Sequence, residues 1–187
     1  ADADLNGINL AKKINDQELL INIAMNSNDE VLVEVAIPKI NDQAIITKLL
    51  TEQIILKNME FFFERENLQK LAVKSLNNQN ELAKVILELN DPKFAFTYRD
   101  LKLMALEKIT DQNILTEIVL KSNDIYISEM VFKEIIDPNL LVKIALQSER
   151  SYLRREAAKK INVQTLLIQL ALESEDESLI EILTGRI

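Results

Sequence analysis

The chain contains no cysteine and no histidine, and these two absences exclude much of the chemistry that proteins perform. Without cysteine there is no disulfide, no thiolate zinc site and no cysteine nucleophile. Without histidine the chain lacks the commonest metal ligand and the commonest general base. Carboxylates are plentiful, but none is paired with a base in a recurring catalytic arrangement. We therefore expect a protein that is not an enzyme and that holds no cofactor and no metal.

Glycine, proline and long apolar runs are also scarce. There are 2 glycines and 3 prolines among 187 residues, and strand-type alternation is absent, so we expect an all-α chain. No run approaches the roughly 18 apolar residues of a membrane span. The formal net charge is −8, whereas a surface that binds duplex nucleic acid normally has an excess of basic residues. We therefore expect no membrane span and no nucleic-acid partner.

The N-terminal residues leave the compartment open. The sequence Ala-Asp-Ala-Asp is compatible with a signal cleaved at a small residue and with a remnant of an expression tag. The absence of cysteine is compatible with either compartment. The chain is therefore expected in the cytoplasm, or outside it if that N-terminus follows a cleaved signal.

What the chain does contain is an internal repeat. An isoleucine or leucine, here called the anchor, returns in the same short pattern and is usually followed by Asn-Asp-Gln or a variant. Four of the six intervals between anchors are 26 residues, and the other two are 36 and 33. A fixed period of this size is typical of a stacked repeat array. The anchors are Ile14, Ile40, Leu76, Ile109, Ile135, Ile161 and Ile187.

Each repeat is predicted to form two short helices. Apolar residues lie eight and four positions before most anchors, as Leu153 and Ala157 do before Ile161, and this spacing marks one face of a helix. The Asp or Asn two residues after most anchors is expected to cap a second helix, because its side chain can accept free amide hydrogens. Helices of about ten residues are marginal alone and need stacking. We therefore predict one domain, residues 1–187, that forms an α-solenoid of about six to seven two-helix repeats.

The motifs A-x-x-x-I and L-L-x-x-I-A, seen at 157–161 and 140–145, resemble those of HEAT-like and leucine-rich-repeat-variant α-solenoids of bacteria. The resemblance covers roughly residues 10–187. It implies a right-handed, curved superhelix in which one row of helices lines a concave surface that holds protein partners. Some variant-family members carry a cysteine-ligated iron–sulfur module, which this chain cannot hold. A few HEAT-like arrays are DNA glycosylases or chromophore lyases, but the glycosylase type relies on a basic groove with tryptophan, and tryptophan is absent here.

Three groups of residues are candidate binding surfaces. The first is a polar stripe on the predicted second helices, and stacking would place its asparagines in a row. Each amide can both donate to and accept from an extended peptide backbone, as asparagine does in the armadillo-type solenoids that these repeats loosely resemble. The alternative is an ordinary solvated face. The residues of this stripe are Asn80, Lys84, Asn113, Glu117, Asn139 and Lys143.

The second group is aromatic and lies in the insertions that make two intervals long. The insertions contain six of the nine aromatic residues in the chain, and we expect the two groups to meet at one edge of the stack. They either pack on each other to fill space or form a partly exposed apolar patch. The residues are Phe61, Phe62, Phe63, Phe94, Phe96 and Tyr98.

The third group is the one basic cluster in this acidic chain, and it includes Arg150, Arg154 and Arg155. These side chains either pair with Glu149, Glu156 and acids of a neighbouring repeat such as Glu129, or provide a docking patch for an acidic partner.

Taken together, the residues favour a non-catalytic scaffold whose inner face holds a protein or an extended peptide. Two alternatives stay open: an enzyme of the HEAT-like DNA-repair or lyase type, and a purely structural segment of a longer repeat protein.

Overall fold

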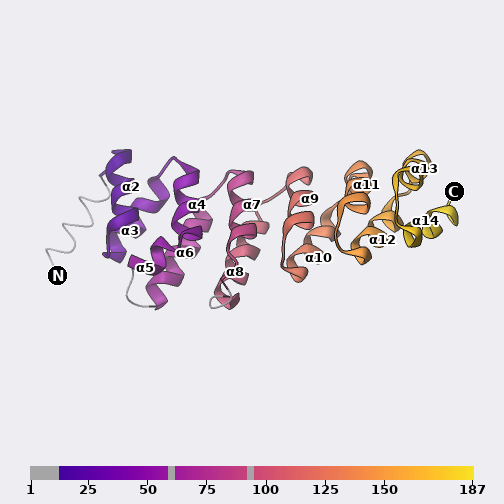
Figure 1. Ribbon diagram of the computed structural model, residues 1–187. Coiled ribbons are helices and arrows are strands. Elements are labelled where there is room, and N and C mark those ends of the chain that lie inside the picture. Colours follow the sequence, from indigo (N-terminus) through magenta and orange to yellow (C-terminus); the bar gives the residue numbers. More distant parts are fainter. Residues whose placement is uncertain (1–12, 59–61, 92–94) are drawn as a thin grey trace. The chain divides into compact units, whose positions relative to one another are not determined.

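The computed structural model describes residues 13–58, 62–91 and 95–187 (Figure 1). Within these ranges the chain is helical and has no strand, which confirms the prediction of an all-α protein with at least ten helices. The helices are α2 (Gln17–Asn26), α3 (Glu30–Ala36), η1 (a 3-10 turn, Ile37–Lys39), α4 (Gln43–Thr51), α5 (Ile54–Asn58), α6 (Phe62–Ser75), α7 (Gln79–Glu88), α8 (Ala95–Leu106), α9 (Gln112–Lys121), α10 (Ile125–Glu134), α11 (Pro138–Gln147), α12 (Ser151–Lys160), α13 (Gln164–Glu173) and α14 (Glu177–Thr184).

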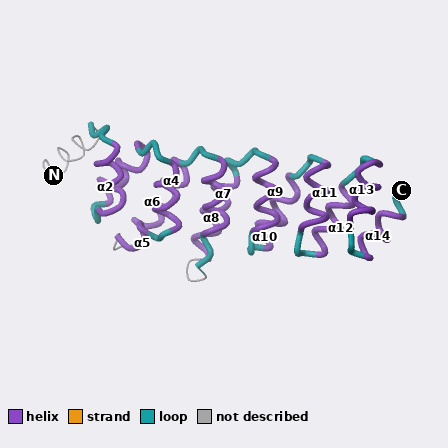
Figure 2. Tube along the Cα trace, turned by 45° about the horizontal axis from the view of Figure 1, so that its top comes forward, coloured by secondary structure: helices purple, strands orange, loops and turns teal. Residues whose placement is uncertain are grey.

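The chain divides into two compact units, unit 1 (Ala1–Ile109) and unit 2 (Thr110–Ile187). In unit 1, α4 packs on α2 and α7, while α6 packs on α3, α4 and α8. In unit 2, α11 packs on α9 and α13, while α12 packs on α11 and α14. In unit 2, short loops join successive helices (Figure 2). The expectation that residues 1–187 form one domain stays a prediction.

Five second helices begin where an acidic or amide side chain satisfies free backbone N–H groups, whereas α13 follows Val163 and has no side-chain cap. Asp111 is one example: its Oδ1 accepts hydrogen bonds from the backbone N–H groups of Asn113 and Ile114. Capping by the residue two places after the anchor is confirmed wherever it was predicted, and Pro138 occupies the first position of α11. The capping residues are Asp16, Asp42, Asn78, Asp111 and Asp137.

Five of the anchors belong to the apolar core that holds the helices together. The apolar spacing predicts that five of the anchors are almost fully buried, and their exposed fractions are between 0% and 6%. These residues are Ile40, Leu76, Ile109, Ile135 and Ile161. At the two ends of the series, Ile14 is half-buried and Ile187 is exposed. Because an apolar side chain contributes most when it leaves water completely, each buried anchor contributes to the stability of its unit.

The irregular positions of the sequence have local structural consequences. Pro38 has no backbone N–H to donate, which predicts a kink or an early end of its helix, and α3 ends at Ala36 and continues as η1. The first insertion adds α5 and lengthens α6 to 14 residues. The extra residues of the second insertion predict a longer first helix, and α8 has 12 residues where α10 and α12 have 10. The expectation that Pro92 begins that helix lies outside the described residues.

In every repeat but that of Ile135, a glutamine three residues after the anchor joins its turn to the next one. In unit 1, Gln17 donates from Nε2 to the carbonyl of Lys39 (3.0 Å) and accepts at Oε1 from the backbone N–H of Asn41 (2.9 Å). In unit 2, Gln112 does the same with the carbonyl of Glu134 (3.1 Å) and the N–H of Ile136 (3.0 Å). Both the Nε2 and the Oε1 of the side-chain amide form hydrogen bonds, so the glutamine fixes the spacing between the two turns.

A cation one residue before the anchor forms a second clamp between turns. Lys160 in unit 2 donates to the carbonyl oxygens of Phe132 (3.2 Å), Lys133 (3.2 Å) and Ile135 (2.8 Å). These carbonyls lie at the end of α10, where a helix lacks internal donors and attracts positive charge. Lys39, Lys108 and Arg186 reach the preceding anchor turn in the same way.

The two clamps substitute for each other where one is missing. Pro138 stands where other repeats have the glutamine, and the turns of Ile135 and Ile161 are joined by Lys160 instead. Glu134 stands where other repeats have the cation, and its turn is held by Gln112. Each joint between consecutive anchor turns in the described part of unit 2 therefore has at least one side-chain clamp.

Candidate protein-binding surface

The polar stripe is most regular on the second helices of unit 2. Asn113 on α9 and Asn139 on α11 are exposed, each one residue into its helix, and α9 packs directly against α11. The backbone N–H of each asparagine donates to the capping aspartate (2.8 Å in both cases), which leaves the side-chain amide directed to solvent. Neither amide bonds to another described residue, so both keep their full capacity for donors and acceptors.

The charged members of the stripe differ in whether they are neutralised. Glu117 forms an ion pair with Lys121 on the same helix (2.6 Å). Lys143 on α11 is exposed and pairs with no acid among the described residues. The face of α9 and α11 thus presents two free amides and one free ammonium group.

The unit 1 part of the stripe has the same local chemistry. Asn80 is exposed on α7, and Lys84 forms an ion pair with Glu81 (2.7 Å), whose hydrogen bond raises the pKa of the ammonium group. Asn80 belongs to unit 1, so a continuous row of Asn80 with Asn113 and Asn139 stays a prediction. The helices that carry Asn113 and Asn139 lie side by side within unit 2 (Figure 1).

The aromatic group can be followed only in part. Phe61 and Phe94 lie outside the described residues, as do the side chains of Phe62, Phe63 and Phe96. Tyr98 is buried in unit 1, and burial raises the pKa of its phenol. Tyr98 therefore belongs to the core, while a shared aromatic edge stays a prediction.

A polar contact joins the two insertions of unit 1. Gln53 has a left-handed backbone (φ 58°), which is uncommon for a residue other than glycine. Its side-chain Nε2 donates to Oδ2 of Asp91 (3.2 Å), so a residue at the start of the first insertion holds one at the start of the second. The sequence contained no signal for this contact, because neither residue belongs to the repeated pattern.

Arg150 stands where three other first helices have a capping aspartate. Asp29, Asp124 and Asp176 cap α3, α10 and α14, whereas Arg150 cannot accept a hydrogen bond and leaves α12 without a side-chain cap. Its guanidinium instead donates to the hydroxyl of Ser128 (2.9 Å) and to the carbonyl of Ser122 (2.6 Å). Arg150 therefore joins two repeats of unit 2, which corrects the expectation that it pairs with a neighbouring acid.

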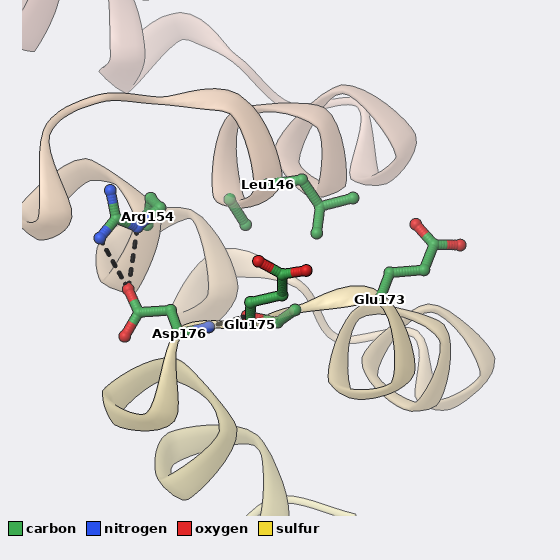
Figure 3. A pocket seen from close by; sticks show the side chains of 7 residues that line it. Leu146, Arg154, Glu173, Glu175 and Asp176 are labelled. Atoms are coloured by element: carbon green, nitrogen blue, oxygen red, sulfur yellow. Dashed lines mark hydrogen bonds and ion pairs between the residues drawn. The ribbon is translucent and has the colours of Figure 1, made fainter.

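Arg154 is also engaged within the chain, and its partner is an acid of a neighbouring repeat, one of the two kinds of partner that the sequence predicts. It donates through Nε and Nη2 to Oδ2 of Asp176 (2.9 and 2.7 Å) and through Nη1 to the carbonyl of Ser148 (2.9 Å) (Figure 3). Of the pairs expected within the basic cluster, the structure places Glu156 with Lys159 (2.7 Å). Arg155 is half-buried and forms no ion pair with a described residue. Two of the three candidate arginines are therefore structural contacts.

An open pocket of about 430 Å³ lies beside the Arg154–Asp176 pair in unit 2. Its wall includes Leu146 from α11, and Glu173 and Glu175 lie opposite, near the end of α13 (Figure 3). Two of the carboxylates have no cation on this wall, because Arg154 is already paired with Asp176. The pocket is therefore acidic at its rim.

The Arg154–Asp176 pair should make the stability of the protein depend on acid pH. Hydrogen bonds from the Ser178 hydroxyl and from Arg154 lower the pKa of Asp176 from 3.8 to about 2. A carboxyl group whose pKa is lower in the folded state stabilises the fold above its unfolded pKa, and that contribution is lost as pH falls toward the folded pKa. We expect wild type to lose this contribution to stability as the pH falls from about 4 to about 2. The variant Asp176→Asn keeps the helix cap but has no carboxyl group to ionise, so it should lack the contribution throughout this range.

The measurement is urea unfolding of wild type and variant at about pH 5 and about pH 3, chosen on either side of the unperturbed carboxyl pKa. Asp124→Asn is the matched control, since Asp124 also caps a helix and forms no ion pair with a described residue. An equal change in pH dependence for both variants would contradict the role given to Arg154.

Comparison with known proteins gives this chain no relative. In the described part of the chain, no helix is long and apolar enough to cross a membrane, and no group of three or more acidic residues is arranged to hold a metal ion. No family model, no curated protein and no solved structure matches the sequence.

Proposed function

We propose that this protein is a non-catalytic scaffold, an α-solenoid of stacked two-helix repeats that binds an extended segment of another protein. The proposal of stacked repeats is supported by buried anchors and by side chains that clamp successive turns at a fixed sequence interval. The absence of histidine and cysteine from the whole sequence supports a binding role in preference to a catalytic one.

The observation that carries the binding proposal is the pair of exposed, unbonded amides on adjacent helices, Asn113 and Asn139. Packed helices lie about 8–10 Å apart. An extended chain advances about 3.3 Å per residue, so every third residue of a bound peptide would meet one asparagine. Each amide could then accept from one backbone N–H and donate to one backbone carbonyl, which suits a partner with any side chains.

Lys143 would favour a bound segment that carries an acidic side chain. Its ammonium group lies one helical turn beyond Asn139 and has no acidic partner among the described residues. An acidic side chain on the bound segment could pair with it. Because the pair would be exposed, it would tune the choice of partner more than the affinity.

The test replaces both amides and follows the binding of a partner isolated by pull-down with the intact chain. We expect Asn113→Ala with Asn139→Ala to weaken binding roughly tenfold, because two bidentate contacts are lost. Thermal stability should change little, since both side chains are exposed. Titration calorimetry at two salt concentrations should show only weak salt dependence, because asparagine carries no charge.

Asn162→Ala is the matched control, as Asn162 is exposed in an anchor turn away from the helix face. It should bind the partner as wild type does. Equal affinity for the double variant and wild type would eliminate the asparagine pair as the binding site.

A further inference from the structure

The pocket beside the Arg154–Asp176 pair carries more negative than positive charge. Its lining includes three acidic side chains and one basic side chain. Arg154 is committed to Asp176, whereas Glu173 accepts a hydrogen bond from the neutral amide of Gln169 (2.9 Å). The side chain of Glu175 forms no hydrogen bond or ion pair with a described residue. The pocket of about 430 Å³ is therefore left with a surplus of two negative charges, and both carboxylates point toward α11 (Figure 3).

The wall of this pocket has two further features that favour a cation with an apolar stem. The last turns of α11 and α13 both reach it, and the C-terminal end of a helix carries a partial negative charge. On the α11 side, Ala145 and the half-buried Leu146 supply apolar surface. A long basic side chain suits this wall, because its methylene stem can cover apolar surface while its charged end stays at the rim.

The equivalent positions one repeat of 26 residues earlier have no such surplus of charge. There Gln147 stands in place of Glu173, and Arg150 stands in place of Asp176. One acid and one base therefore occupy the positions at which this pocket has three acids and one base. The negative charge is thus a property of this joint and not of the repeat.

The ends of the second helices of unit 2 already bind guanidinium groups of the chain itself. Arg150 donates to the carbonyl of Ser122 (2.6 Å), and Arg154 donates to the carbonyl of Ser148 (2.9 Å). These two serines directly follow α9 and α11, where helix carbonyls lack internal donors. A guanidinium group is therefore a cation that this side of unit 2 is built to hold.

We propose that this pocket binds the side chain of an arginine supplied by a partner protein. The guanidinium group pairs with Glu173 and Glu175, and the methylene stem covers Leu146. Arginine fits better than lysine, because its planar fork of five donors can serve more than one carboxylate. Both carboxylates are exposed, so the pocket selects a partner more than it tightens binding. The site shares no residue with the asparagine pair and does not rest on the function proposed above.

The probe is N-acetyl-arginine methylamide, which presents one arginine side chain without terminal charges. The matched probe is N-acetyl-citrulline methylamide, which has nearly the same shape but a neutral urea group. Each is titrated into the whole ¹⁵N-labelled chain, and backbone amide signals are followed by nuclear magnetic resonance at low and high salt. The arginine probe should shift the signals of Leu146, Glu175 and Asp176, and less so at high salt. The citrulline probe should leave them in place.

Glu173→Gln combined with Glu175→Gln should weaken binding of the arginine probe roughly tenfold. The control is Glu129→Gln with Glu134→Gln, which removes the same charge from two exposed positions of α10. It should bind the probe as wild type does, and so should the double asparagine variant. Thermal unfolding verifies that each variant is folded. Equal weakening by the two glutamate pairs, equal shifts with both probes, or no shift at the pocket would overturn the proposal.

Discussion

Replacement of Ile135 by alanine is expected to destabilise the protein by about 2–5 kcal/mol. Ile135 is completely buried at the end of α10, in the turn that the side chains of Gln112 and Lys160 hold. The substitution removes apolar contacts and leaves a cavity that the clamped turn cannot easily close. Urea unfolding of wild type and variant measures the difference in free energy.

The neighbouring residue provides the control. Ile136 is the same residue type and is 76% exposed, so Ile136→Ala should change the free energy of unfolding by no more than about 0.5 kcal/mol. If the two substitutions had similar effects, the assignment of the anchor register would be wrong.

Replacement of Lys160 by methionine should cost about 1.5–3 kcal/mol, the range for hydrogen bonds to a charged group. Lys160 bonds to three carbonyls at the end of α10, and its ammonium group lies 4.9 Å from the centre of the Phe132 ring. Methionine keeps the length and the apolar stem of the side chain but cannot donate. The effect should be large at this joint because Pro138 leaves it without a glutamine clamp.

Lys159→Met is the control for charge and composition. Lys159 is exposed and forms a surface ion pair with Glu156, which contributes little in water. Thermal unfolding should therefore rank the variants as Lys159→Met close to wild type and Lys160→Met clearly below it. The reverse order would contradict the clamp between turns.

The sequence predicted the local features of this fold because they depend on nearby residues. A capping aspartate such as Asp111 acts on N–H groups two and three positions ahead, so its role can be inferred from its place in the repeat. The burial of Ile135 follows from the apolar spacing of the helix before it. Both predictions are confirmed by the structure.

The contacts between repeats could not be predicted in the same way. Gln112 recurs in the motif, but its partners, Glu134 and Ile136, lie 22 and 24 positions away. For Arg154 the sequence predicts an acid close in sequence or one of a neighbouring repeat, and its partner is Asp176 of the neighbouring repeat, a residue that the prediction does not name. These contacts depend on how one turn packs on the next, and the sequence of a single repeat does not give that arrangement. The recurrence of Gln three residues after an anchor, and of Lys or Arg one residue before an anchor, was the one signal for the clamps.

For the candidate binding surface, the sequence predicted which asparagines are exposed better than it predicted the contacts of the arginines. The exposure of Asn113 and Asn139 follows from their position one residue into the second helix, opposite the apolar face. The contacts of the basic cluster were less well predicted, because the sequence alone does not show which residue a charged side chain contacts. Arg150 and Arg154 both proved to be contacts inside unit 2.

The central claim, that successive two-helix repeats stack at a constant spacing, can be tested by distances between pairs of spin labels. The chain has no cysteine, so label sites can be introduced without removing native thiols. Cysteines at positions 113 and 139 lie one repeat apart, and cysteines at 113 and 165 lie two repeats apart, all at exposed places in unit 2. Electron paramagnetic resonance should give a separation near 8–10 Å for the first pair and about twice that for the second. A second distance equal to or shorter than the first would contradict the stacked arrangement.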